Sequence, residues 1–129
     1  MVILTYNAPN RPLSENESRR LHWATRSKRL KDWSLLTTMA WRKADQTDKD
    51  TLLNQKIQIK VQIPFTKNAR RDAHNYVGTN VKTIIDALVK EGMVEDDTSE
   101  YVEVLEPTLS IDKLNEVIIF LKPIGKIKE

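Results

Sequence analysis

The chain has 129 residues, 40% of them hydrophobic and 30% charged, and its formal net charge is +3. This composition excludes a disordered chain, and the absence of cysteine excludes disulfides, thiolate zinc sites and a cysteine nucleophile. The apolar runs are too short to cross a bilayer, and no leader-like segment opens the sequence. We therefore expect one domain of residues 1–129 in the cytoplasm, with no membrane partner.

In chain order, the first half of the sequence predicts a strand and a helix. Residues 2–9 favour a strand that ends in the proline-containing turn of residues 9–12. Ser14 and Glu17 have the spacing of a helix capping box. A helix is predicted over residues 27–44 and a polar loop over residues 45–50. The helix is expected to present one packing stripe, made of Leu30, Trp33, Thr37, Ala40 and Trp41. Trp23 is expected to pack in the core or against a helix, like the other two tryptophans.

The second half predicts three strands and one strongly amphipathic helix. Residues 56–64 alternate apolar and polar side chains, as a half-buried strand does. Residues 79–90 have the helical apolar spacing, with Thr79 as N-cap and Gly92 as the left-handed stop. Residues 101–109 and 115–123 favour two further strands joined by a turn at 110–114. The predicted class is α+β, with a small mixed sheet of about four strands packed with two main helices.

The charges are unevenly distributed along these elements. Residues 11–43 hold nine Lys or Arg residues against three acids, whereas residues 91–116 hold nine acids against one Lys. A basic segment followed by an acidic one suits a nucleic-acid ligand together with a cation site. Ordinary surface charge explains the same pattern, so both interpretations remain open at this point.

Four aspartates, a histidine and a lysine lie on or beside the second predicted helix. Clustered carboxylates repel one another unless a cation intervenes, and oxygen ligands suit Mg²⁺ or Mn²⁺. Each residue also has a plainer interpretation: a surface ion pair on the helix, a turn at the acidic pair, a hydrogen-bonded loop histidine. The group consists of Asp72 and His74 before the helix, Lys82 and Asp86 on it, and Asp96 and Asp97 after it.

The stretch RRDAHN…NVKTIIDALVKEGMVEDD resembles the central signature of the RusA-type Holliday junction resolvases. That signature is an Arg-rich stretch ending in D-x-D-N, then K-x-x-x-D-A-L, then a glycine and a D-D pair. The opening strand, the PLSEN turn, IQIKVQIP and the closing strands follow the same order. The resemblance implies a RusA-like α+β endonuclease that works as a homodimer. It also implies Mg²⁺ or Mn²⁺ as cofactor and cleavage of paired strands at four-way junctions and other branched DNA in recombination and repair.

By motif position, the resemblance implies roles for particular residues. Asp72 is expected to be the first acidic ligand and Asp97 the acid of the second loop, while Lys82 offsets charge on the scissile phosphate. The implied catalytic residues are Asp72, Asp97, Lys82 and His74. The implied metal ligands are Asp72, Asp97, Asp96, His74 and Asp86. The expected DNA-binding residues are Arg19, Arg20, Arg26, Lys28, Arg29, Lys67, Arg70, Arg71 and Asn75.

Two departures from the family pattern bear on these roles. His74 stands where the pattern has its second Asp, which lowers the negative charge of a metal site and tilts it toward Mn²⁺. The segment YVGTNV before Lys82 is longer than the usual connection, so the helix start is less well defined. A branched-DNA-binding protein with an impaired nuclease site is therefore the alternative, and a small interaction protein with merely acidic loops is a third interpretation.

Overall fold

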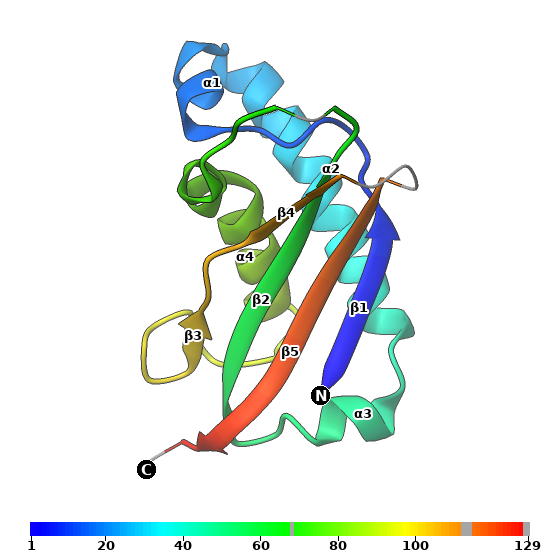
Figure 1. The fold of residues 1–129 in the computed structure, drawn as a ribbon. Coiled ribbons are helices and arrows are strands. Elements are labelled where there is room, and N and C mark those ends of the chain that lie inside the picture. The colour runs from blue at the N-terminus through cyan, green and yellow to red at the C-terminus, as the bar shows by residue number, and fades with distance from the viewer. Residues whose placement is uncertain (68, 112–114, 128–129) are drawn as a thin grey trace.

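The computed structural model describes residues 1–67, 69–111 and 115–127 (Figure 1). Eleven elements follow one another along these residues. They are β1 (Val2–Asn7), α1 (Glu15–Arg20), α2 (Trp23–Lys43), α3 (Gln46–Asp50), β2 (Gln55–Phe65), η1 (Ala73–Tyr76), η2 (Val77–Val81), α4 (Lys82–Lys90), β3 (Val102–Val104), β4 (Thr108–Ile111) and β5 (Glu116–Lys126). No helix within the described ranges has the length and apolarity needed to span a membrane.

The strands form one mixed sheet. Its order is β1-β5-β2-β3, and β4 pairs with β2 further along the same edge. β5 is antiparallel to both β1 and β2, whereas β3 and β4 run parallel to β2. The two main helices, α2 and α4, cover one face of the sheet and leave the other uncovered (Figure 1). The predicted α+β class is thereby confirmed.

The prediction of a single strand over residues 101–109 is wrong. β3 and β4 are two short strands, separated by residues 105–107. The amide of Leu105 still donates to the carbonyl of Ile59 at 2.9 Å, but Pro107 has no amide hydrogen with which to continue the ladder. Ser110 and Ile111, expected in a turn, belong to β4, and the rest of that turn, residues 112–114, lies outside the described residues.

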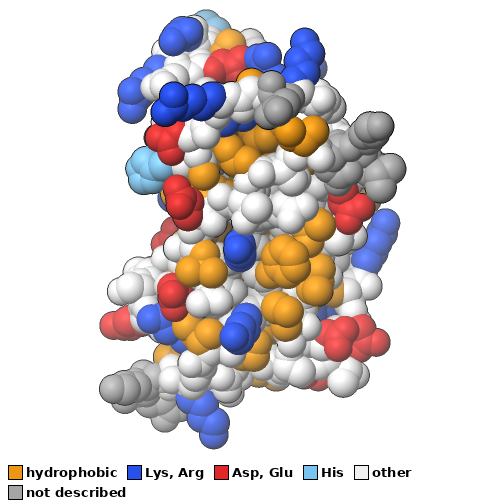
Figure 2. Space-filling view, viewed as in Figure 1, with side chains coloured by type: hydrophobic (Ala, Val, Ile, Leu, Met, Phe, Trp, Pro, Cys, Tyr) orange, Lys and Arg blue, Asp and Glu red, His pale blue; other side chains and the backbone are white. Residues whose placement is uncertain are grey.

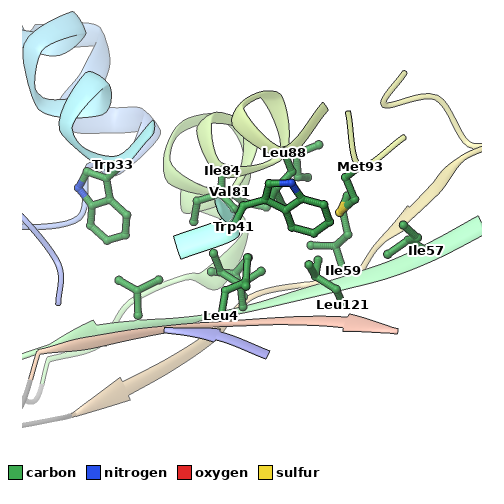
Figure 3. Close-up of a cluster of buried hydrophobic side chains, with 14 of the residues drawn as sticks. Leu4, Trp33, Trp41, Ile57, Ile59, Val81, Ile84, Leu88, Met93 and Leu121 are labelled. Carbon is green, nitrogen blue, oxygen red and sulfur yellow. The ribbon is translucent and has the colours of Figure 1, made fainter. Parts of the chain in front are cut away.

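The core lies between the sheet and the two main helices. The alternation predicted for residues 56–64 is confirmed, because Ile57, Ile59, Val61 and Ile63 are all buried. Ile84 and Leu88 of α4 face them together with Trp33 and Trp41 of α2 (Figure 3). Burial of this apolar layer is the main stabilising term of the fold and holds α4, with its polar outer side, in a fixed position.

α2 begins at Trp23, earlier than the predicted start near residue 27. The ring nitrogen Nδ1 of His22 accepts a hydrogen bond from the amide of Ala24 at 3.2 Å and so caps the helix. None of residues 23–32 is buried, whereas Trp33, Thr37 and Trp41 are. The expectation that Trp23 packs in the core or against a helix is wrong, because its side chain is exposed. α1 and the start of α2 extend beyond the ends of the strands, where no layer covers them (Figure 1).

Two further local predictions need correction. Residues 46–50, expected to be a loop, form α3, because the carboxylate of Asp45 accepts from the amide of Thr47 at 2.7 Å and starts a helical turn. Ser14 does cap α1, accepting from the amide of Glu17 at 3.1 Å. The carboxylate of Glu17, however, forms ion pairs with Arg11 and Arg29 instead of returning to the cap.

The helix before the acidic loop also starts earlier than predicted. A helical run begins at Ala73 and passes through a 3₁₀ turn and a π turn into α4, so the longer YVGTNV connection is absorbed as helix. Thr79 is therefore not an N-cap. Its hydroxyl donates to the carbonyl of Leu13, and the side-chain oxygen of Asn80 accepts from the amide of Leu13 at 2.8 Å. Gly92 ends the helix with a φ of +89°, as predicted.

Candidate functional site

Lys82 lies between two carboxylates that come from different parts of the chain. Its Nζ is 3.9 Å from Oδ1 of Asp86, one helical turn along α4, and 3.8 Å from Oδ2 of Asp97 in the loop after the helix. The side chains are 61%, 56% and 41% exposed, respectively. Solvent-exposed pairs of this kind add little to stability. Their effect is to hold an accessible ammonium group at a defined place on the surface.

Asp72 caps the start of the helical run that leads to Lys82. Its Oδ1 accepts from the amide of His74 at 3.0 Å, and its backbone carbonyl accepts from the amide of Asn75 at 3.1 Å. Asp72 and His74 are exposed at the surface, and Asn75 is half-buried. The run from Ala73 to Lys82 is helical throughout, so the cap and the lysine belong to one structural unit.

The acidic pair after α4 lies at a bend of the chain. Oδ1 of Asp96 accepts from the amide of Asp97 at 2.8 Å, which uses that oxygen locally. Asp97 reaches Lys82, whereas Asp96 and the neighbouring acids up to Glu100 lie on the exposed loop. Of the plainer interpretations, the ion pair on the helix is present in the structure. Asp97 lies at a bend, and the hydrogen-bonded turn follows it, where the amide of Tyr101 donates to the carbonyl of Thr98 at 2.9 Å.

The five expected metal ligands are not gathered into one group. Across residues 1–67, 69–111 and 115–127, no three Asp, Glu or His side chains are grouped so that they could hold a metal ion. Asp86 and Asp97 each lie near the same ammonium group, which already balances part of their charge. Carboxylate oxygens are the donors that Mg²⁺ prefers, and metal binding at these residues stays a prediction.

Three of the nine expected DNA-binding residues are engaged within the protein. Arg29 donates to the carbonyl of Arg11 at 2.5 Å and lies 3.4 Å from a carboxylate oxygen of Glu17. Arg26 donates to the carbonyl of Ser18 at 3.3 Å. Arg71 donates to the carbonyl of Lys67 at 2.8 Å, and its guanidinium lies 4.0 Å from the ring centroid of Phe65. These contacts hold the three guanidinium groups against the protein. They lie at the end of the molecule that carries α1, the start of α2, Lys67 and Arg70, which we call the basic end (Figure 1).

The remaining basic side chains stand at the surface of the same end. Arg19, Arg20, Lys28, Lys67 and Arg70 are exposed. Figure 2 shows Lys and Arg side chains gathered where α1 and the start of α2 lie. Exposed cations of this kind attract phosphate groups over a distance of about 10 Å at moderate salt.

A groove near this end adds a residue that the motif did not point to. It has a volume of about 370 Å³ and is lined by Arg11, Lys67 and Arg71 together with prolines 9, 12 and 64. Arg11 comes from the turn after β1, so its neighbours in the groove are remote in sequence. Nearby, burial raises the pKa of the Tyr76 hydroxyl, whose ring meets Phe65 edge to face at 5.3 Å. The basic composition of residues 11–43 was the sole signal for Arg11.

No family model and no curated protein matches the chain.

Proposed function

We propose that this protein is a RusA-like endodeoxyribonuclease that resolves four-way DNA junctions by phosphodiester hydrolysis, in DNA recombination and repair. The observation that carries the proposal is the position of Lys82, held by Asp86 and by Asp97. Those are the helix lysine, the helix acid and the loop acid of the signature. Asp97 meets Lys82 although the rest of α4 and part of the following loop separate them along the chain. The chemistry of the basic end, which suits phosphate, supports the same function.

Lys82 is the residue whose chemistry follows most directly from its surroundings. An exposed ammonium group can donate hydrogen bonds to a non-bridging phosphate oxygen and offset the charge that develops there during hydrolysis. Asp86 and Asp97 limit the positions of the ammonium group, so less entropy is lost when the phosphate arrives. The exposed cations of the basic end would hold the flanking DNA backbone, which predicts binding that weakens steeply with salt.

Mg²⁺ or Mn²⁺ dependence, a homodimer and a cytoplasmic location belong to this proposal. The metal would supply the Lewis-acid chemistry, with Asp72, His74, Asp86, Asp96 and Asp97 as the oxygen and nitrogen donors that the resemblance implies. A two-fold dimer would bring one site to each of two strands. The uncovered face of the sheet offers a surface for a second copy, since Ile3 on it is 53% exposed and hydrophobic side chains lie across it (Figure 2).

The test is cleavage of a synthetic mobile four-way junction, with a linear duplex as control, in Mg²⁺ and separately in Mn²⁺. Lys82→Ala is expected to reduce the cleavage rate by about a hundredfold, the order of effect seen when one charge-stabilising donor is removed. Lys90→Ala, at the other end of the same helix, is the matched control and should retain wild-type cleavage. Asp72→Asn should abolish paired nicks, and His74→Ala reports whether the imidazole is needed.

Sedimentation of the same samples measures the oligomeric state, and a monomer at working concentration would contradict the dimer.

The second candidate is a branched-DNA-binding protein of the same fold without nuclease activity. The dispersed carboxylates and the imidazole of His74 in place of an Asp favour it. It predicts salt-sensitive junction binding, no cut in either metal, and binding that Asp72→Asn leaves unchanged. Binding without cleavage would therefore reject the endonuclease and support this candidate, while the absence of both would reject the two together.

A further inference from the structure

Trp23 is an unusual surface residue. Its side chain is 65% exposed, whereas Trp33 is fully buried and Trp41 is 9% exposed. The closest aromatic partner in the described part of the chain is the ring of His22, at a centroid distance of 5.6 Å and an interplanar angle of 34°. An indole in this position leaves a large flat apolar surface in water, where it adds little to the stability of the fold.

The corner that carries Trp23 is braced by several hydrogen bonds. The ring of His22 is fixed because its Nδ1 caps α2 at the amide of Ala24. Arg26 donates to the carbonyl of Ser18 at 3.3 Å, and the amide of Leu21 donates to the same carbonyl at 3.3 Å. The end of α1 is thereby tied to the start of α2. A ring held on a braced helix loses little conformational entropy when it stacks on a ligand.

The surroundings of Trp23 are positively charged. The sequence contains no acid between Glu17 and Asp32. Arg19 and Arg20 at the end of α1 are exposed, as is Lys28 on the next turn of α2. An exposed aromatic ring among cations is the arrangement that proteins use for unpaired nucleotides, with the ring under a base and the cations on the phosphates. A fully stacked duplex offers no base face to such a ring, whereas a branch point can expose one.

We propose that Trp23, with His22 beside it, stacks on an unpaired base at the branch point of DNA while Arg19 and Arg20 hold the flanking phosphates. The proposal rests on the proposed function for the choice of branched DNA, but the stacking itself requires only an unpaired base and a backbone. Trp23 would then distinguish a junction from a duplex, and the exposed cations would bind both. In this division the aromatic ring gives selectivity and the charges give affinity.

The experiment measures equilibrium binding of wild type, Trp23→Ala, Trp23→Phe and Trp23→Leu to a short oligothymidylate, to a four-way junction and to a linear duplex. Trp23→Ala is expected to weaken binding to the oligothymidylate and the junction by about tenfold, within the range for one stacked base, and to leave duplex binding unchanged. Trp23→Phe should recover most of the loss and Trp23→Leu should not, because stacking needs a π-face and not merely apolar bulk.

Fluorescence supplies an independent readout. Trp33 and Trp41 are buried, so quenching of tryptophan emission by oligothymidylate should be lost in Trp23→Phe but retained when Trp33 is replaced by Phe. Equal binding of the single-stranded probe by wild type and Trp23→Ala would overturn the inference even if junction cleavage were normal. Conversely, Trp23-dependent binding without junction cleavage would keep the inference and reject the endonuclease. A Trp23 that contacts a protein partner instead would leave all three DNA affinities unchanged, and that result would also overturn the inference.

Discussion

The two halves of α2 are one continuous helix with different chemistry. Its second half buries Trp33, Thr37 and Trp41 against the sheet and α4. Its first half, residues 23–32, buries no side chain and carries cations and an exposed indole. One helix therefore serves two purposes. The part over the sheet stabilises the fold, and the part beyond the strands presents the exposed side chains that we propose bind DNA.

The buried half should respond most strongly to substitution, through the stability of the fold. Trp33 fills the core and its Nε1 donates to the side-chain oxygen of Asn10 at 2.8 Å. Trp33→Ala should therefore lower the free energy of unfolding by about 3–5 kcal/mol, because it leaves a cavity and an unpaired acceptor. Trp23→Ala is the matched control and should change it by less than about 0.5 kcal/mol. Urea unfolding measures both, and equal losses would mean that the first half also packs.

DNA affinity should depend on salt through the cations of α1 and of the neighbouring exposed half of α2, and not through those at the far end of the helix. Replacing Arg19 and Arg20 by Ala is expected to reduce the slope of log affinity against log salt by about 0.9 for each phosphate that is no longer neutralised. A control that removes two charges elsewhere, Lys43→Ala with Lys90→Ala, changes the far ends of α2 and α4 and should leave the slope unchanged. Fluorescence anisotropy with a labelled junction measures it. An equal change of slope in the control would show that the salt dependence comes from the net charge of the protein and not from cations at the basic end.

High pH should lower the stability of the fold through Tyr6 of β1, which contacts Thr37 in the buried half of α2. Burial raises the pKa of Tyr6 strongly, against an opposing hydrogen bond in which its hydroxyl meets Oγ1 of Thr37 at 2.8 Å. In the unfolded chain the hydroxyl group of Tyr6 ionises near pH 10, so its contribution to the free energy of unfolding is complete below that pH. Above it, stability should fall by up to about 1.4 kcal/mol per pH unit. Tyr6→Phe should remove this part of the alkaline loss, and unfolding across the alkaline range compares the two proteins; parallel curves would contradict it.

The weakest response should come from the end of α2 that meets α4. Arg42 forms a bidentate contact with Glu91, and this hydrogen-bonded ion pair lowers the pKa of Glu91. Its contribution is present above the ordinary value of 4.5 and is lost as the pH falls through the lower folded value. Glu91→Gln should therefore be slightly less stable than wild type at neutral pH and equal to it once the carboxyl group is protonated in both states. A difference that persists in acid would point to packing instead of charge.

Much of the fold could be predicted because it depends on local periodicity. The alternation of residues 56–64 and the helical spacing of residues 79–90 identify the faces that become buried, and Gly92 identifies the end of α4. The break at Pro107 and the start of α3 at Asp45 were missed. In both places a single hydrogen-bonding group determines where the element begins or ends. The pattern of apolar residues contains no information about a single capping side chain or a missing amide hydrogen.

The candidate site was also predictable only in part from the sequence. The order of Asp72, Lys82, Asp86 and Asp97 along the chain could be read directly, and it carries the family resemblance. The meeting of Lys82 with Asp97 depends on how the loop after α4 returns, and the inward engagement of Arg29 depends on where α1 docks. Neither path is encoded in a local spacing.

The amino-acid order alone specifies which faces are apolar, where the charges gather and in what order the signature residues occur, since those properties belong to residues near one another in the chain. Three-dimensional packing was needed to decide that Trp23 stays in water while Trp33 is buried, although both lie on one helix. Burial requires a second layer, and the sheet ends before the helix does (Figure 1).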